Sequence, residues 1–289
     1  MSERTSEEIL ELARGEIAAR QLRGIEERSL RDLPWRYAFI GLGLALLVGL
    51  LAWPGAPVEW KMYAVVHGVC AQAHTVDMAG ARLPLCARNT GIYSGFLVTV
   101  LYLLALGRAR AAKLPPLPVV VALITFVLVM AVDGVNSTLV DLFLPHLYTP
   151  RNELRTLTGG GMGVAMAVLI FLMLNMSLRR NPDTEQRIMR GWVELGGALL
   201  LNLLVLAAMY GNVALMFWPI AVVSWLGITG ILYAINLLLT ALVMGYEGQV
   251  LRLGQLARPA TLALVFTLIE LGALSALRFW LESQGLMAI

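Results

Sequence analysis

One long apolar stretch decides the fold class: residues 192–245 read WVELGGALLLNLLVLAAMYGNVALMFWPIAVVSWLGITGILYAINLLLTALVMG. A helix crosses a hydrocarbon core of about 30 Å with about 20 apolar residues. The stretch is therefore too long for a single crossing. Because Tyr210-Gly211-Asn212 interrupts it, we predict two spans, near 192–211 and 220–245.

The rest of the chain has the same character. It is 58% hydrophobic and 14% charged, whereas a soluble domain usually carries about 25% charged residues. The sequence predicts an all-α, polytopic helical membrane protein with seven spans. Residues 60–70 are apolar but too short to cross, and they predict a re-entrant or interfacial segment. The other five spans are expected near 37–53, 91–107, 119–144, 160–178 and 260–281.

The placement of positive charge orients the predicted spans. Cytoplasmic loops are enriched in Lys and Arg. One face of the predicted topology collects all but six of the 22 Lys and Arg residues. We therefore expect a cell-membrane protein with a cytoplasmic amino terminus and a carboxyl terminus outside. The polar loops 54–90 and 145–159 fall on the outer face. The six basic residues expected on that face are Lys61, Arg82, Arg88, Arg151, Arg155 and Arg278.

Residues 1–33 predict a cytoplasmic amphipathic helix that precedes the transmembrane domain, residues 34–289. They are charged and lack an apolar core before Pro34, so no signal peptide is expected. Six Arg and eight Asp or Glu occur among them, whereas a helix that binds anionic lipid is mostly basic. Three interpretations are open: the helix lies against the cytoplasmic ends of the spans, it associates with a partner or with itself, or it lies on the lipid surface.

Polar motifs interrupt the apolar chain in three places. Residues 67–72 read HGVCAQ, residues 83–95 read LPLCARNTGIYSG, and residues 152–163 read NELRTLTGGGMG. Together with Asp133-Gly134 they resemble the signature of an uncharacterised prokaryotic membrane-protein family, domain of unknown function 2085. That family shows Cys-His-Gln, Pro-Leu-Cys-Ala-Arg-Cys-Thr-Gly-Ile-Tyr, Asp-Gly and Asn-x-x-Arg-x-x-Thr-Gly. The resemblance covers about residues 60–175 and implies a membrane location without a known activity.

The chain departs from this signature at Ala71 and Asn89, which stand where the family has His and Cys. The family pattern suggests a small metal or redox site, since Cys and His are the usual zinc ligands. Four ligands remain on paper, although their spacing is not that of a recognised zinc finger. A Cys70–Cys86 disulfide on an oxidising outer face and two unlinked thiols are the alternatives. The remaining candidate ligands are His67, Cys70, His74 and Cys86.

Asp133 is the most informative single residue, because an ionisable group inside a span is by default a functional candidate. Asn136 and Ser137 lie within about one helical turn of it, and Arg88 and Arg155 supply cations nearby. Either an Asp–Arg pair braces the spans, or these groups bind a ligand. The Gly-rich run after Thr158 could offer free backbone N–H groups to an anion at a helix start, or it could permit close helix packing.

Three functions follow from these residues. The first is an outer-face polar pocket that binds an anionic small molecule or a lipid headgroup. Transport is preferred to catalysis there, because no catalytic motif or nucleophile is recognisable. The second is a structural or accessory subunit of a membrane complex, and the third is a metal or redox sensor at the outer face. The expected partners are the lipid bilayer and either other subunits of a membrane complex or further copies of this chain. Bound lipid is the only cofactor considered, and nothing supports nucleic-acid binding. The expected ligand-binding residues are Arg88, Asp133, Asn136, Asn152, Arg155 and Thr158.

Overall fold

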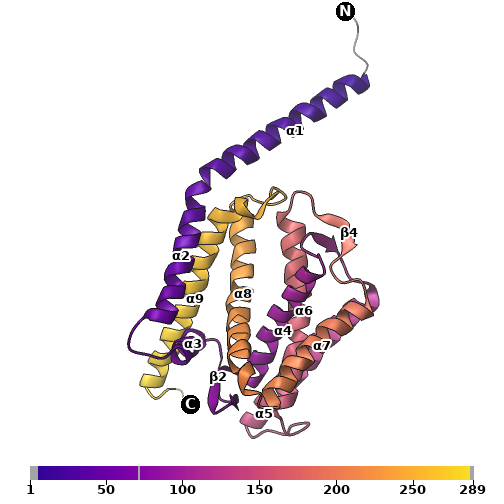
Figure 1. The fold of residues 1–289 in the computed structure, drawn as a ribbon. Helices are drawn as coiled ribbons and strands as arrows, with labels where there is room; N and C mark the ends of the chain where they lie inside the picture. The colour runs from indigo at the N-terminus through magenta and orange to yellow at the C-terminus, as the bar shows by residue number, and fades with distance from the viewer. Residues whose placement is uncertain (1–5, 71, 287–289) are drawn as a thin grey trace, which may run out of the picture.

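The computed structural model describes residues 6–70 and 72–286, and long helices dominate it (Figure 1). Each of the seven predicted spans is a helix, which confirms the all-α class. Six of these helices, all except α4, are long and apolar enough to cross a membrane. The first turn of α4 carries the polar residues Arg88 and Asn89. The seven are α2 (Leu33–Ala52), α4 (Ala87–Ala105), α5 (Leu117–Asp141), α6 (Asn152–Leu178), α7 (Trp192–Tyr210), α8 (Phe217–Val243) and α9 (Ala257–Ser283).

The predicted break within residues 192–245 is confirmed. Helix α7 ends at Tyr210, and Asn212 adopts a left-handed φ of 52°. Asn tolerates this region of backbone space better than most residues do. A short 3-10 helix, η1 (Ala214–Met216), then leads into α8. A second one, η2 (Leu253–Leu256), precedes α9.

Helices α4 and α6 pack side by side at the centre of the bundle, and α8 lies against α4 (Figure 1). The close approach depends on glycine. A Cβ atom at Gly159 would lie 2.4 Å from the Arg88 carbonyl oxygen, and one at Gly163 would lie 2.2 Å from that of Ile92. Small residues let membrane helices approach in this way. Close helix packing is therefore the role of these two glycines.

Short elements cap the two ends of the bundle where the sequence predicted loops. Strands β1 (Thr75–Met78) and β2 (Ala81–Cys86) form an antiparallel hairpin. Its turn residues, Ala79 and Gly80, have φ of 55° and 79°, the signs that a two-residue type I′ turn requires. Strands β3 (Ala111–Lys113) and β4 (Asp183–Arg187) pair at the opposite end (Figure 1). Helix α3 (Val58–Val66) corresponds to the short segment predicted at 60–70.

Both predicted polar loops gather at one end of the bundle. This end, formed by α3, the β1–β2 hairpin and residues 142–151, is called the loop end below (Figure 1). The predicted loop 145–159 is wrong for its second half, because α6 begins at Asn152. Hydropathy marks only the apolar part of a membrane helix, whereas backbone hydrogen bonding extends the helix through polar turns whose side chains find partners.

The amino-terminal helix α1 (Ser6–Arg31) extends away from the bundle (Figure 1). It meets the rest of the chain near its own carboxyl end, against α2 and η2. The interpretation in which it lies across the ends of the spans is therefore wrong. Association with a partner and contact with a lipid surface remain predictions. Residues 1–5 lie outside the described part of the chain.

Candidate functional site

Asp133, which is buried, and Arg88, which is partly buried, form an ion pair at the loop end. The Asp133 side chain is 1% exposed. Its Oδ2 accepts hydrogen bonds from Arg88 Nη2 at 2.6 Å and Arg88 Nε at 3.1 Å. Thr158 Oγ1 donates to the same oxygen at 3.4 Å. The pair joins α5 to α4, and Thr158 adds a contact from α6.

Tyr148 completes the surroundings of the carboxylate and is a residue that sequence reasoning missed. Its hydroxyl donates to Asp133 Oδ1 at 2.6 Å. Burial and this hydrogen bond raise the pKa of Tyr148 to about 12, so the hydroxyl stays a donor at neutral pH. No spacing rule links Tyr148 to Asp133, because a loop of irregular path carries it back to α5.

Asn136 holds that loop in place. Its Oδ1 accepts from the backbone N–H of Leu147 at 2.8 Å, and its Nδ2 donates to the Tyr148 carbonyl at 2.9 Å. Asn136 is fully buried. The structure therefore uses this predicted ligand-binding residue to position Tyr148. A direct contact between Asn136 and a ligand remains a prediction.

Arg155 lies close to this ion pair, but its own hydrogen-bond partners carry no charge. It is 5% exposed. Its Nε donates to Ser137 Oγ at 3.4 Å, and its Nη1 donates to Asn152 Oδ1 at 3.3 Å. Both partners are neutral. Among the described residues no carboxylate lies within ion-pair distance of this guanidinium.

Ser137 connects the two arginines. Its hydroxyl oxygen accepts from Arg88 Nη2 at 2.7 Å and from Arg155 Nε. Asn152 extends the cluster toward the hairpin, since its Nδ2 donates to the Thr75 carbonyl at 3.4 Å. All six predicted ligand-binding residues therefore meet in one cluster, called the Arg155 cluster below: Arg88, Asp133, Asn136, Asn152, Arg155 and Thr158, together with Ser137 and Tyr148.

The predicted anion site on free backbone N–H groups at Thr158–Gly161 is wrong. Only the first four N–H groups of a helix lack partners within it. Helix α6 begins at Asn152, so the Gly-rich run lies well inside the helix. Of the groups predicted to bind an anion, the guanidinium groups of Arg88 and Arg155 remain.

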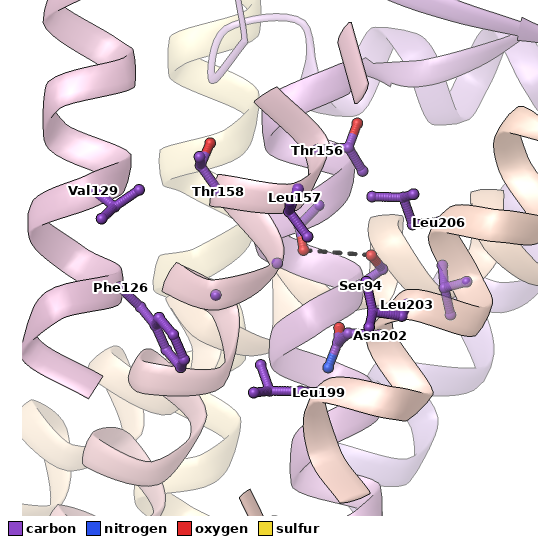
Figure 2. Close-up of a pocket in the computed structure, with 14 residues that line it drawn as sticks. Ser94, Phe126, Val129, Thr156, Leu157, Thr158, Leu199, Asn202, Leu203 and Leu206 are labelled. Carbon is purple, nitrogen blue, oxygen red and sulfur yellow. Dashed lines mark hydrogen bonds between the residues drawn. The ribbon is translucent and has the colours of Figure 1, made fainter. Parts of the chain in front are cut away.

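A cavity of about 320 Å³ adjoins the Arg155 cluster between α5 and α7. Figure 2 shows Phe126 and Val129 on one side and leucines of α7 on the other. Thr158 belongs to both the cavity wall and the cluster. The lining is mostly apolar, and its members are Gly91, Ser94, Phe126, Val129, Thr156, Leu157, Thr158, Gly160, Gly161, Leu199, Asn202, Leu203, Val205 and Leu206.

The part of the chain that carries the Arg155 cluster also matches a known protein family. Residues 70–169 match the family model described as "Predicted membrane protein (DUF2085)". The match confirms the resemblance read from the motifs, over about a third of the chain. The DUF2085 segment runs from Cys70 into α6, and it contains every member of the Arg155 cluster. No curated protein and no solved structure matches the chain.

The structure brings Cys70 of the motif 67–72 and Cys86 of the motif 83–95 close together as free thiols. The backbone N–H groups of Cys86 and Gln72 lie 3.3 Å and 3.4 Å from Cys70 Sγ. The disulfide between Cys70 and Cys86 stays a prediction. It would close a loop of about 15 residues, worth roughly 3 kcal/mol in the chain-entropy model.

The four residues proposed as metal ligands have other partners. His67 Nδ1 lies 2.6 Å from Gln72 Oε1, and His67 Nε2 lies 2.8 Å from Glu282 Oε2. His74 points toward Asp141 at 3.6 Å. No group of three or more His, Cys, Asp or Glu residues suited to a metal ion occurs within residues 6–70 and 72–286.

We expect the Cys70 thiol to react as a thiolate near neutral pH. A hydrogen bond from the Cys86 thiol is the main cause that lowers the pKa of Cys70 to about 6, against the opposing effect of burial. The thiolate fraction rises as pH rises through the pKa, so alkylation of reduced protein by iodoacetamide should reach half its maximal rate near pH 6.

The Cys86→Ala variant should move this midpoint to higher pH, because the main stabilising hydrogen bond is removed. Mass spectrometry of Cys70-containing peptides follows the reaction. An unchanged midpoint in Cys86→Ala would show that Cys86 does not stabilise the Cys70 thiolate.

Proposed function

We propose that this membrane protein binds an anionic small molecule or a lipid headgroup at the loop end of the bundle, where Arg155 meets the anion. The observation that carries the proposal is a buried guanidinium whose partners are neutral. A buried charge is costly unless it is paired and hydrogen-bonded. An anion reaching Arg155 would supply the missing opposite charge.

The charges of the Arg155 cluster support this assignment. The cluster contains two guanidinium groups, those of Arg88 and Arg155, but only one buried carboxylate. That carboxylate, Asp133, is bonded to Arg88. Asp141, on the last turn of α5, is mostly exposed and faces His74. Asp133 and Asp141 both lie near enough to attract Arg155, but neither is within ion-pair distance of its guanidinium. Guanidinium suits phosphate and carboxylate, because its planar donor fork matches their oxygen atoms.

Under this proposal the other predicted ligand-binding residues have more specific roles. Arg88 acts through its pair with Asp133 and links α4 to α5. Asn152 and Thr158 stand beside Arg155 on the first turns of α6 and can hydrogen-bond the ligand. The charge bias of the loops favours an outer-face location for this site. Transport is the activity we prefer for it, since no catalytic motif is recognisable among its residues.

We expect Arg155→Gln to weaken binding of glycerol phosphate by at least about tenfold, because one charge-assisted hydrogen bond contributes about 1.5–3 kcal/mol. Isothermal titration calorimetry of the detergent-solubilised protein measures the effect. Arg82→Gln is the matched control, since Arg82 belongs to the loop end but is exposed and faces Asp77. If Arg155→Gln bound glycerol phosphate with wild-type affinity, Arg155 would not be part of the binding site.

A second candidate function, an accessory subunit of a membrane complex, is favoured by Glu270. This residue lies at the middle of α9 and is exposed on the bundle surface. Asn236 Nδ2 donates to its Oε2 at 2.8 Å. Carboxyl groups at this depth rarely face lipid, so a partner helix would explain its position. The mass of the gently solubilised protein tests this: a complex that Glu270→Leu dissociates supports the subunit, and an unchanged monomer contradicts it.

A further inference from the structure

We propose that the cavity between α5 and α7 holds one acyl chain of an anionic lipid whose headgroup binds at Arg155. The inference rests on the proposed function, because Arg155 supplies the headgroup site. It adds the chemical class of the ligand: an amphiphile with a phosphate or carboxylate head and a single seated chain.

The position of the cavity connects it to Arg155. Thr158 lies one helical turn after Arg155 on α6. Its hydroxyl lies 3.2 Å from the Arg155 carbonyl oxygen, and its side chain also lines the cavity (Figure 2). The turn of α6 that carries the buried cation is therefore also a wall of the cavity. A ligand can place a charged end beside Arg155 and an apolar end beside α7.

The chemistry of the walls favours a hydrocarbon chain. Leu199, Leu203 and Leu206 of α7 face Phe126 of α5 across the cavity (Figure 2). The polar floor is largely satisfied within the chain, since Ser94 Oγ donates to the Thr90 carbonyl at 2.5 Å and Asn202 Nδ2 donates to the Ala198 carbonyl at 2.8 Å. These walls offer water few free hydrogen-bond partners, whereas a stable buried water needs two to four polar partners.

The size and the setting of the cavity agree with one chain. Pockets that hold small ligands span about 300–1,000 Å³, and 320 Å³ lies at the low end of that range. Leu203 is exposed at the cavity rim, on a helix apolar enough to span a membrane. A lipid chain can therefore enter sideways from the bilayer.

Three probes separate the head from the chain. Lysophosphatidic acid has an anionic head and one chain, glycerol phosphate has the head alone, and lysophosphatidylcholine has the chain with a zwitterionic head. Each buried methylene contributes about 0.8 kcal/mol, roughly fourfold in affinity. By native mass spectrometry, we expect the wild-type protein to bind lysophosphatidic acid at least about tenfold more tightly than either other probe.

Leu203→Trp fills the cavity and should bring the affinity for lysophosphatidic acid down to that for glycerol phosphate. Leu204→Trp is the matched control, because Leu204 is the next residue of α7, is 57% exposed and does not line the cavity. This control should bind both anionic probes as the wild type does. If Leu203→Trp does not fold, Leu206→Trp replaces it in the test, because Leu206 lines the cavity from the same helix.

The outcomes distinguish the two proposals. Equal affinity of the wild-type protein for lysophosphatidic acid and glycerol phosphate, with both lowered in Arg155→Gln, would overturn the acyl-chain site and leave the anion site standing. Unchanged binding of both probes in Arg155→Gln would overturn the anion site and the acyl-chain inference with it. Full lysophosphatidic acid binding in a folded Leu203→Trp variant would also overturn the chain site.

Discussion

The Gly163→Ala variant should lose about 3 kcal/mol of unfolding free energy, the upper end of ordinary overpacking. A Cβ atom at Gly163 would lie 2.2 Å from the Ile92 carbonyl oxygen and 2.6 Å from the Phe96 backbone nitrogen. Both neighbours are backbone atoms of α4, which cannot turn aside as a side chain can. Helices α4 and α6 would have to separate, and every contact between them would loosen.

Gly160→Ala is the control for this effect. It makes the same chemical change on the same helix, and a Cβ atom at Gly160 would meet nothing within 4 Å. We expect its stability to equal or slightly exceed that of the wild type, because alanine favours helix over glycine by about 1 kcal/mol. Unfolding in mixed micelles measures both variants. Equal stability of the two would contradict close glycine packing as the basis of the α4–α6 contact.

Asp133→Ala should have the other large effect, a loss of about 3 kcal/mol. Removing one member of a buried ion pair leaves the other charge uncompensated, and here Arg88 would lose its only carboxylate partner among the described residues. Asp141→Ala is the control on the same helix, since its side chain is 57% exposed. A surface change of this kind usually alters stability by less than about 0.5 kcal/mol.

The double variant Arg88→Met with Asp133→Leu distinguishes a brace from a binding group. Apolar replacement of a whole buried pair is often neutral or stabilising, so most of the lost stability should return in unfolding measurements. Glycerol phosphate binding at Arg155 should persist in this variant if the pair only braces α4 against α5. Loss of binding in a stable double variant would instead assign Asp133 or Arg88 to the ligand.

The sequence by itself determined the class of the protein and the places where polar residues matter. Inside a membrane no water is present to hydrogen-bond the backbone N–H and C=O groups. Apolar stretches such as 192–245 therefore form helices, in which these groups bond one another. A buried carboxylate at Asp133 and cations at Arg88 and Arg155 were recognisable for the same reason, since charges are rare in apolar surroundings. These are local properties, and each can be read from one segment.

Only the tertiary structure decided which of these charges are paired. Arg88 and Arg155 look alike in the sequence, yet Asp133 neutralises one and leaves the other with Ser137 and Asn152. Tyr148 entered the cluster through a loop path that no periodicity describes. The start of α6 at Asn152 likewise depends on partners supplied by other segments. Pairing, burial and helix ends are set by contacts between residues far apart in the chain, and their energies depend on distances that a sequence does not contain.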